Sequence, residues 1–372
     1  MPRPFQTILP LLLLAASAIA QTHRYQVLDL GVLSGQTQST ASAINASGAV
    51  VGNSGNHPFV FRNCTISDLG ILPNGFGATA TGINNDGNVS GYSEGSDQGI
   101  HAVDWHDGSI HLLLAGNTYQ SQGLGITNTG RVIGYEYNGA VAYGIAFDDD
   151  LPIVVPSDDD PTYGWGSVNV ATGGNSSGQF TGYRQIYNSL NQFQLQLGLV
   201  TLPGTSAWKR INPPSSFTGD VYPWAINESG ATSGWIRHYA GATVTDHAFL
   251  SKTTAAAATD LGTLGGTTSH AYALNNARWV VGAASNASNT TLAFLYDGTS
   301  MVDLNTTLIN PTGWQLTSAN GINDYNQIVG TGIHNGQTRA FLLNPITTNL
   351  PITTIALPCS TSISRLSLNE QQ

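Results

Sequence analysis

The chain of 372 residues is long enough for one large domain or two ordinary ones, and it carries a formal charge of −10. Only 9% of its residues are charged, whereas about 25% are charged in an average soluble protein. This acidic, charge-poor composition argues against nucleic acids and anionic membrane surfaces as partners, because both require basic patches. The 43 glycines, together with many Val, Ile, Thr and Tyr, predict an all-β protein with many short strands.

The first twenty residues have the three parts of an export signal. Arg3 supplies positive charge, an apolar run extends from Ile8 to Ala16, and Ala18-Ile19-Ala20 has the small-residue pattern that signal peptidase cuts. We therefore expect cleavage after Ala20 and a mature protein in the periplasm or outside the cell. The apolar run is too short to span a bilayer comfortably and no second one follows, so we expect no transmembrane segment in the mature chain.

A nine-residue pattern recurs through the mature chain. It consists of an aliphatic residue, Asn, two free positions, Gly, one free position, two apolar positions and Gly, as in INASGAVVG and INESGATSG. Repeats of this kind are typical of solenoids and β-propellers. Seven copies, some with substitutions, begin 39 to 52 residues apart at Ile44, Ile83, Ile126, Gly174, Ile226, Leu274 and Ile322.

Each nonapeptide predicts a hairpin. Asn opens a turn because its side chain can bond the backbone two residues on, and the Gly three residues later suits a left-handed backbone. Asn326 can replace that Gly, whereas Arg278 is a poor substitute. The last Gly of the pattern marks a close backbone approach or a bulge.

Two further strands are expected after each hairpin. The third carries His-Ala-Phe or a variant, as at His247-Ala248-Phe249, and the fourth carries Asp-Leu-Gly, as at Asp260-Leu261-Gly262. Four short strands in about 45 residues is the size of a propeller blade. The pattern resembles the HAF repeat family of extracellular proteins, whose name spells the motif at His247. This resemblance covers nearly all of the mature chain and implies an extracellular, propeller-like repeat protein, with no activity assigned to particular residues.

The two ends of the mature chain predict how the repeats close. The seventh copy ends at Arg339-Ala340-Phe341 without a following Asp-Leu-Gly strand, whereas the mature chain begins with an orphan strand that ends in Asp29-Leu30-Gly31. Pairing these segments would close a ring and remove an exposed sheet edge. An open solenoid would need polar caps at both ends, and none is evident. We therefore predict one seven-bladed β-propeller over residues 21–345, with a C-terminal tail over residues 346–372.

The two cysteines fit this closure. Cys64 lies in the first predicted blade and Cys359 lies in the tail that follows the last one. A closed ring makes these blades neighbours, and export provides an oxidising compartment, so we predict a Cys64–Cys359 disulfide. Two free or buried thiols are the alternative.

Aromatic residues recur in the segments that lead into the first strand of each repeat. In a propeller these segments fall on one face, where exposed rings can stack on sugars or anchor a peptide. Packing between blades is the alternative role. The residues are Phe76, Tyr119, Trp165, Tyr222, Trp224, Tyr272 and Trp314.

Two acidic triplets are the candidate metal ligands. Carboxylate oxygens in an exported loop can hold Ca²⁺, although a solvated acidic loop is the alternative. No other cofactor is expected. The residues are Asp148, Asp149, Asp150, Asp158, Asp159 and Asp160.

Signatures of catalysis are scarce. The chain has only four Glu, and it shows no nucleophile elbow, metal-ligand motif or phosphate loop. The spacing of His101, His106 and His111 matches no zinc signature. The favoured hypothesis is a secreted, non-enzymatic binding module with an aromatic-rich face and a polysaccharide or surface protein as ligand. The alternatives are an exported carbohydrate-active enzyme with acidic residues in its central funnel and a structural protein of the cell envelope.

Overall fold

The computed structural model of the protein describes residues 23–346, except for the short segments 114–119, 138, 140–141, 149–150, 155–165, 188–189, 191, 203, 205–207, 218, 242 and 253–256. The predicted signal peptide and nearly all of the predicted tail lie outside these residues. The described chain consists of strands β1 to β28 and a short 3-10 helix, η2 (Leu304–Thr307), so the all-β prediction is confirmed. None of the described residues lies in a helix that is long and apolar enough to cross a membrane.

Three antiparallel sheets have four strands each. In two of them the strand order follows the chain: β2 (Ser39–Ile44), β3 (Val50–Ser54), β4 (His57–Arg62) and β5 (Thr65–Asp68), then β6 (Ala78–Ile83), β7 (Val89–Glu94), β8 (Ile100–His106) and β9 (Ser109–Leu112). The third joins the two ends of the chain in the order β1 (Tyr25–Asp29), β28 (Gln337–Pro345), β27 (Ile328–His334) and β26 (Trp314–Ile322).

The remaining strands form two eight-stranded sheets, each made of two antiparallel four-strand units that share one short parallel contact. Ala142 opposite Val168 joins the first two units, and Asp246 opposite Thr268 joins the second two. The first sheet contains β10 (Gln120–Ile126), β11 (Val132–Tyr137), β12 (Ala142–Asp148), β13 (Leu151–Val154), β14 (Gly166–Gly174), β15 (Phe180–Tyr187), β16 (Phe193–Thr201) and β17 (Trp208–Arg210). The second contains β18 (Val221–Ile226), β19 (Thr232–Ala240), β20 (Thr243–Ser251), β21 (Thr259–Asp260), β22 (Gly265–Leu274), β23 (Val280–Asn286), β24 (Thr291–Tyr296) and β25 (Met301–Asp303).

The first strand of each unit lies at the centre. Each first strand contacts the first strand of the next unit along the chain, and β26 contacts β2, so these inner strands form a closed circle. Every inner strand has a register shift close to its end, which leaves one bulged residue opposite no partner. The bulged residues are Ser42, Thr81, Leu124, Thr172, Trp224, Tyr272 and Asn320.

The glycines of the nonapeptide have the roles that the pattern predicts. Gly48, in the turn, has φ of +80°, and Arg278 and Asn326 take the same left-handed backbone in their repeats. A Cβ on Gly52, the last Gly of the first copy, would lie 2.0 Å from the carbonyl oxygen of Thr40 on the neighbouring inner strand. The predicted close backbone approach is therefore confirmed at this position.

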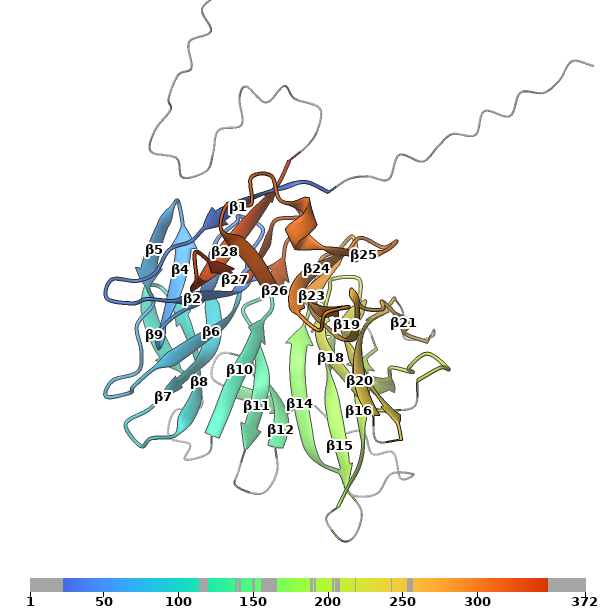
Figure 1. The fold of residues 1–372 in the computed structure, drawn as a ribbon. Coiled ribbons are helices and arrows are strands. Elements are labelled where there is room, and N and C mark those ends of the chain that lie inside the picture. Colours follow the sequence, from blue (N-terminus) through green and yellow to red (C-terminus); the bar gives the residue numbers. More distant parts are fainter. Residues whose placement is uncertain are drawn as a thin grey trace, which may run out of the picture.

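The predicted closure is also confirmed. Strand β1 pairs with β28 in antiparallel register, with Val27 opposite Leu343, and Figure 1 shows these two ends of the chain side by side. The N–H of Leu30 extends the pairing by donating to the carbonyl oxygen of Ala340, at 3.1 Å. Tyr25 is buried in the same apolar cluster as Phe341, so the orphan strand contributes to the core as well as to the sheet.

The core lies between neighbouring sheets. One cluster combines Val51 and Val60 of the β2–β5 sheet with Ala80 and Val103 of the β6–β9 sheet. Similar clusters lie between each four-strand unit and the next, so the units bury their faces against one another around the ring.

Candidate functional site

The Asn of each hairpin links its own turn to the next repeat. Asn227 shows the pattern: its Oδ1 accepts hydrogen bonds from the backbone N–H of Ser229 (3.1 Å) and of Ala231 (2.9 Å). Its Nδ2 donates to the backbone carbonyl of Asn275, one repeat further on, at 3.0 Å. Only an amide side chain accepts and donates in this way at once, which explains why Asn recurs here.

These bonds run around the centre of the molecule. The same Nδ2 donation joins Asn45 to Asn84, Asn84 to Thr127, Asn175 to Asn227, and Asn275 to Asn323. The donation from Asn323 to the carbonyl of Asn45, at 3.0 Å, closes the circle across 278 residues of sequence. We call these seven residues the amide ring: Asn45, Asn84, Thr127, Asn175, Asn227, Asn275 and Asn323.

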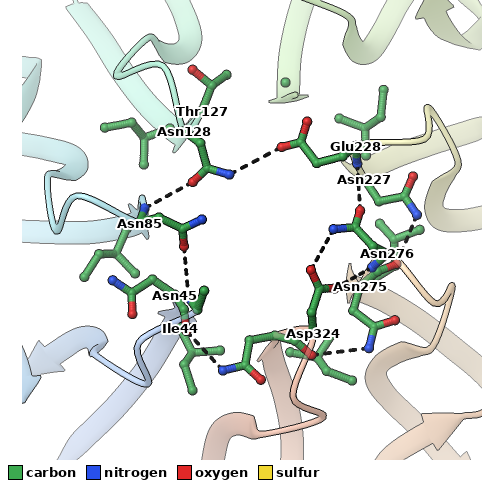
Figure 2. A pocket seen from close by; sticks show the side chains of 18 residues that line it. Ile44, Asn45, Asn85, Thr127, Asn128, Asn227, Glu228, Asn275, Asn276 and Asp324 are labelled. Atoms are coloured by element: carbon green, nitrogen blue, oxygen red, sulfur yellow. Dashed lines mark hydrogen bonds between the residues drawn. The ribbon is translucent and has the colours of Figure 1, made fainter. Parts of the chain in front are cut away.

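The amide ring has one weak step. Thr127 has a hydroxyl group where the other members have an amide, and its Oγ1 accepts from the N–H of Arg131 and contacts Thr129. Its side chain makes no hydrogen bond to Asn175. Glu228 spans this step, because its carboxylate accepts from the N–H and Oγ of Ser176 (both 3.0 Å) and from Nδ2 of Asn128 (3.4 Å), as Figure 2 shows in part.

A cavity of about 220 Å³ opens at this end of the inner strands. Its rim holds two carboxylates, and no basic side chain lines it. Glu228 is bonded as described, and Asp324 accepts from the N–H (2.8 Å) and Nδ2 (2.7 Å) of Asn276. We call this end of the inner strands the amide end. Its polar groups mainly hold the repeats together. The aliphatic residues Ile44, Ile83, Ile126, Ile226, Leu274 and Ile322 also line the cavity.

The recurrent His residues are structural as well. His57 Nδ1 lies 2.9 Å from Asp68, and His247 Nδ1 lies 3.1 Å from Asp260. The same carboxylates accept the backbone N–H two residues on, that of Gly70 or Gly262, so the Asp-Leu-Gly motif is a turn that pairs with the His strand. His106 and His111 stack at 3.8 Å, and among the described residues no cluster of three metal-ligating side chains occurs.

The predicted aromatic residues occupy several different positions. Phe76 lies in the loop before β6 and is 73% exposed. The other described members lie within inner strands, which corrects the expectation that they occupy the preceding loops. Trp314 begins β26 and packs on His334 (4.4 Å between ring centres) and on Phe341. Tyr119 and Trp165 lie outside the described residues.

Repeat five carries an aromatic platform, which we define as Tyr222, Trp224 and Trp235. Tyr222 and Trp235 lie opposite each other on β18 and β19, and their rings stack at 5.2 Å with an interplanar angle of 7°. Trp224 occupies the bulge of β18, which turns it out of the regular alternation of the strand. Its ring lies 5.7 Å from Trp235 and is 38% exposed.

Polar groups line one edge of the platform. Arg237 donates to both carboxylate oxygens of Asp246 (2.9 Å each), and its Cζ lies 5.2 Å from the centre of the Tyr222 ring. Asp246 also contacts Nε2 of His270 (3.0 Å), and His270 packs edge-on against Trp235. Tyr272, the bulged residue of β22, continues the cluster beyond His270 at 6.4 Å.

The environment fixes the charge states of this cluster. Burial by itself would raise the pKa of Asp246, but the hydrogen bonds from His270 and Arg237 and the guanidinium charge outweigh it and lower the pKa to about 2. Burial raises the pKa of Tyr222 to about 12, although the charge of Arg237 acts in the opposite direction. At neutral pH the platform therefore has one neutral phenol, that of Tyr222, beside the ionised pair of Arg237 and Asp246.

A recurring aromatic position on the second strand of the repeats was not predicted from the sequence. Tyr92, Tyr135, Tyr183 and Trp235 each follow the last Gly of their nonapeptide, in repeats two to five. Tyr183 lies 6.1 Å from Tyr222, and the neighbouring phenol of Tyr92 adds to burial in raising the pKa of Tyr135. The recurring Gly-Tyr and Gly-Trp pairs were the signal. In the other repeats Asn53, Ala283 and Thr331 take this position.

The remaining predicted sites cannot be placed in full. Cys64 is disulfide-bonded, but Cys359 lies outside the described residues, so the Cys64–Cys359 pairing stays a prediction. The side chain of Asp148 is also outside the described part. So are the residues Asp149, Asp150, Asp158, Asp159 and Asp160, and the calcium site stays a prediction too.

Comparison with known proteins bears on the fold. No protein-family model matches the chain, and no curated protein matches it. YCF48 bound to D1 peptide is similar, with a TM-score of 0.51 and 12% identity over 87% of this chain and 97% of YCF48. YCF48 from Cyanidioschyzon merolae has a TM-score of 0.47 (11% identity, 86% of this chain, 99% of that one). Trypanosoma rangeli sialidase in complex with the inhibitor DANA has a TM-score of 0.43 (10% identity, 77% of this chain, 57% of that one). YCF48 is a β-propeller, and the likeness to it, together with the circle of four-stranded units, gives this chain a β-propeller fold.

Proposed function

We propose that the protein is a secreted, non-enzymatic binding module of the HAF repeat type, in which one seven-bladed propeller presents the aromatic platform to a polysaccharide. Seven nonapeptides and the strands β1 to β28, grouped in fours, support the blade count. The signal-like first twenty residues support export.

The observation that carries the proposal is the platform itself. The ring of Trp224 is partly exposed beside the stacked pair of Tyr222 and Trp235, so its apolar face is available to the C–H face of a sugar. Arg237, Asp246 and His270 at its edge can exchange hydrogen bonds with sugar hydroxyl groups. Because the stacking and the ion pair hold these groups in place, little ordering is needed on binding.

Binding is favoured over catalysis by the states of the two carboxylates near the platform. Asp220, close to Tyr222, is buried and accepts hydrogen bonds from the N–H of Gln196 and the hydroxyl of Tyr239 (both 2.7 Å). Asp246 is held by two cationic or hydrogen-bonding partners and has a pKa of about 2, so it is an ionised acceptor at neutral pH and cannot donate a proton. Glycoside hydrolysis needs a protonated acid and a second carboxylate about 5–10 Å away.

A glycan array compares the wild-type protein with Trp224→Ala. We expect the variant to bind about tenfold more weakly, which corresponds to about 1.4 kcal/mol, and Trp224→Phe to retain part of the affinity. Tyr325→Ala is the matched control, because Tyr325 is an aromatic residue that is 68% exposed in a hairpin turn at the amide end. It should bind like the wild type.

Equal glycan binding by Trp224→Ala and wild type would contradict the proposal, as would the absence of any glycan binding. YCF48 is solved with a bound peptide, so a peptide array on the same four proteins is the natural companion experiment. Peptide binding that depends on Trp224, without glycan binding, would move the ligand class to a surface protein. Release of sugar products from a glycan would favour the alternative of a carbohydrate-active enzyme.

A further inference from the structure

A second cavity lies in repeat two, three repeats away from the platform. Its volume is about 240 Å³, and it extends over the start of β6, the end of β7 and the start of β8, with Asn53 of β3 and the turn between β3 and β4 also lining it. Pockets for drug-sized ligands measure about 300–1,000 Å³. This cavity is therefore of a size for a single side chain or a small organic group.

Two aromatic rings border the cavity. Phe76 is held in an exposed position by its loop, because Gly75 packs so closely on the backbone that a Cβ there would lie 2.2 Å from the carbonyl oxygen of Glu94. Tyr92 lies on β7, opposite Thr79 of β6. A flat cation or an apolar group can pack against rings arranged in this way.

The cavity also contains an unpaired carboxylate. Glu94 lies two residues after Tyr92 on β7, so both side chains point to the same face of the sheet. Gly77, just before β6, lets Asn56 approach closely, because a Cβ there would lie 3.2 Å from Cβ of Asn56. Within the described residues the carboxylate of Glu94 makes no hydrogen bond and no ion pair. By contrast, Asp68, Asp97, Asp246 and Asp260 are all paired with a His or Arg side chain.

In the part of the chain that the structure describes, no Lys or Arg lines the cavity to neutralise Glu94. The side-chain amide of Asn56, on the opposite wall, also makes no hydrogen bond among the described residues. A partly buried carboxylate without a partner favours a ligand that brings a positive charge with it. The formal charge of −10 adds a long-range attraction for basic partners.

We propose that this cavity binds an arginine side chain of a protein partner. The planar guanidinium packs against Phe76 and Tyr92, donates to the carboxylate of Glu94, and leaves a further N–H for the amide oxygen of Asn56. Arginine fits better than lysine because its charge is planar and stacks on aromatic rings. The site does not depend on the platform or on its sugar ligand, since it shares no residue with them.

The test is a methyl-NMR titration of protein labelled at isoleucine methyl groups, because Ile100 lines the cavity and reports on its occupancy. The probe is the peptide acetyl-Gly-Arg-Gly-amide, and the matched peptide contains citrulline, which keeps the shape of arginine without its charge. We expect the arginine peptide to shift the Ile100 signal in a saturable way. The citrulline peptide should bind at least tenfold more weakly, and the lysine peptide should lie between them.

Variants separate the contributions. We expect Glu94→Gln and Phe76→Ala to weaken the arginine peptide at least fivefold, and higher salt to weaken it in the wild type, whereas Trp224→Ala and Tyr325→Ala should bind as the wild type does. Thermal unfolding of each variant checks that it is folded. Equal binding of the arginine and citrulline peptides would overturn the proposal, and so would an unchanged affinity in Glu94→Gln. A shift of Ile100 by oligosaccharides that depends on Phe76 but not on Glu94 would assign the cavity to sugar instead.

Discussion

The two ends of the inner strands differ in how strictly they repeat. At the amide end the same Asn donation recurs in six of the seven repeats, and it closes on itself from Asn323 to Asn45. Towards the other end, the residue after the last nonapeptide Gly is aromatic in repeats two to five and is Ala283, Thr331 or Asn53 in the others. The Asn side chains that recur around the molecule hold the ring together. The aromatic side chains of repeats two to five make that sector unlike the rest.

The bulge position shows the same division within one structural feature. In Thr81 and Thr172 the hydroxyl of the bulged residue donates to a carbonyl of the next repeat, at 2.9 Å in both cases. In repeats five and six the same position holds Trp224 and Tyr272, which make no such bond and join the aromatic cluster instead. At these two positions an aromatic side chain thus replaces a hydrogen-bonded link between repeats.

The sharpest test of the comparison is a substitution in the amide ring. Asn227→Ala removes three bonds to its own turn and one to Asn275, and it leaves buried backbone groups without partners, so we expect a loss of about 3 kcal/mol in the free energy of unfolding. Urea unfolding measures it. Asn128→Ala is the matched control, because that side chain is exposed and makes two bonds at the surface, donating to Glu228 (3.4 Å) and accepting from the N–H of Asn85 (3.1 Å). A similar loss of unfolding free energy in both variants would show that the amide ring stabilises the protein no more than exposed hydrogen bonds do.

A smaller effect is expected in the aromatic sector at high pH. Burial, together with the neighbouring Tyr135 and Tyr222, raises the pKa of Tyr183 to about 12 from the usual value of about 10. The folded state therefore favours the neutral phenol: this contribution is intact below pH 10 and is lost as the pH rises towards 12. Between pH 8 and pH 11.5, the free energy of unfolding should drop by about 2 kcal/mol less for Tyr183→Phe than for the wild type. Equal drops would contradict the assigned environment.

The smallest effect is a gain. Thr127→Asn restores an amide at the weak step of the ring, where Nδ2 would reach the carbonyl of residue 175 as its equivalents do in other repeats. We expect about 1 kcal/mol of added stability by thermal or urea unfolding. Thr127→Ser, which keeps the hydroxyl without adding a donor amide, should give no gain. A destabilised Thr127→Asn would indicate that Glu228 already replaces the missing bond and leaves no room for it.

Much of the ring could be predicted from the sequence. The turn chemistry of the nonapeptide, the close approach at its last Gly and the pairing of the first strand with the last are confirmed. The placement of the aromatic residues in loops was wrong for Trp224 and Tyr272, because a bulge near the end of each inner strand re-aims these side chains from within the sheet. The acidic cavity residue Glu94 had no motif to mark it. It is notable because none of the described residues pairs with its carboxylate.

The sequence by itself determined the repeat, the hairpins and the all-β class, because each depends on residues a few positions apart whose backbone preferences are local. Only the tertiary structure decided which repeats meet and what their contacts do. The bridge from Glu228 to Asn128 spans 100 residues, and the ion pair of Asp246 reaches His270 across two units. Such contacts depend on sheet register and on the closure of the ring, and no periodicity along the chain records them.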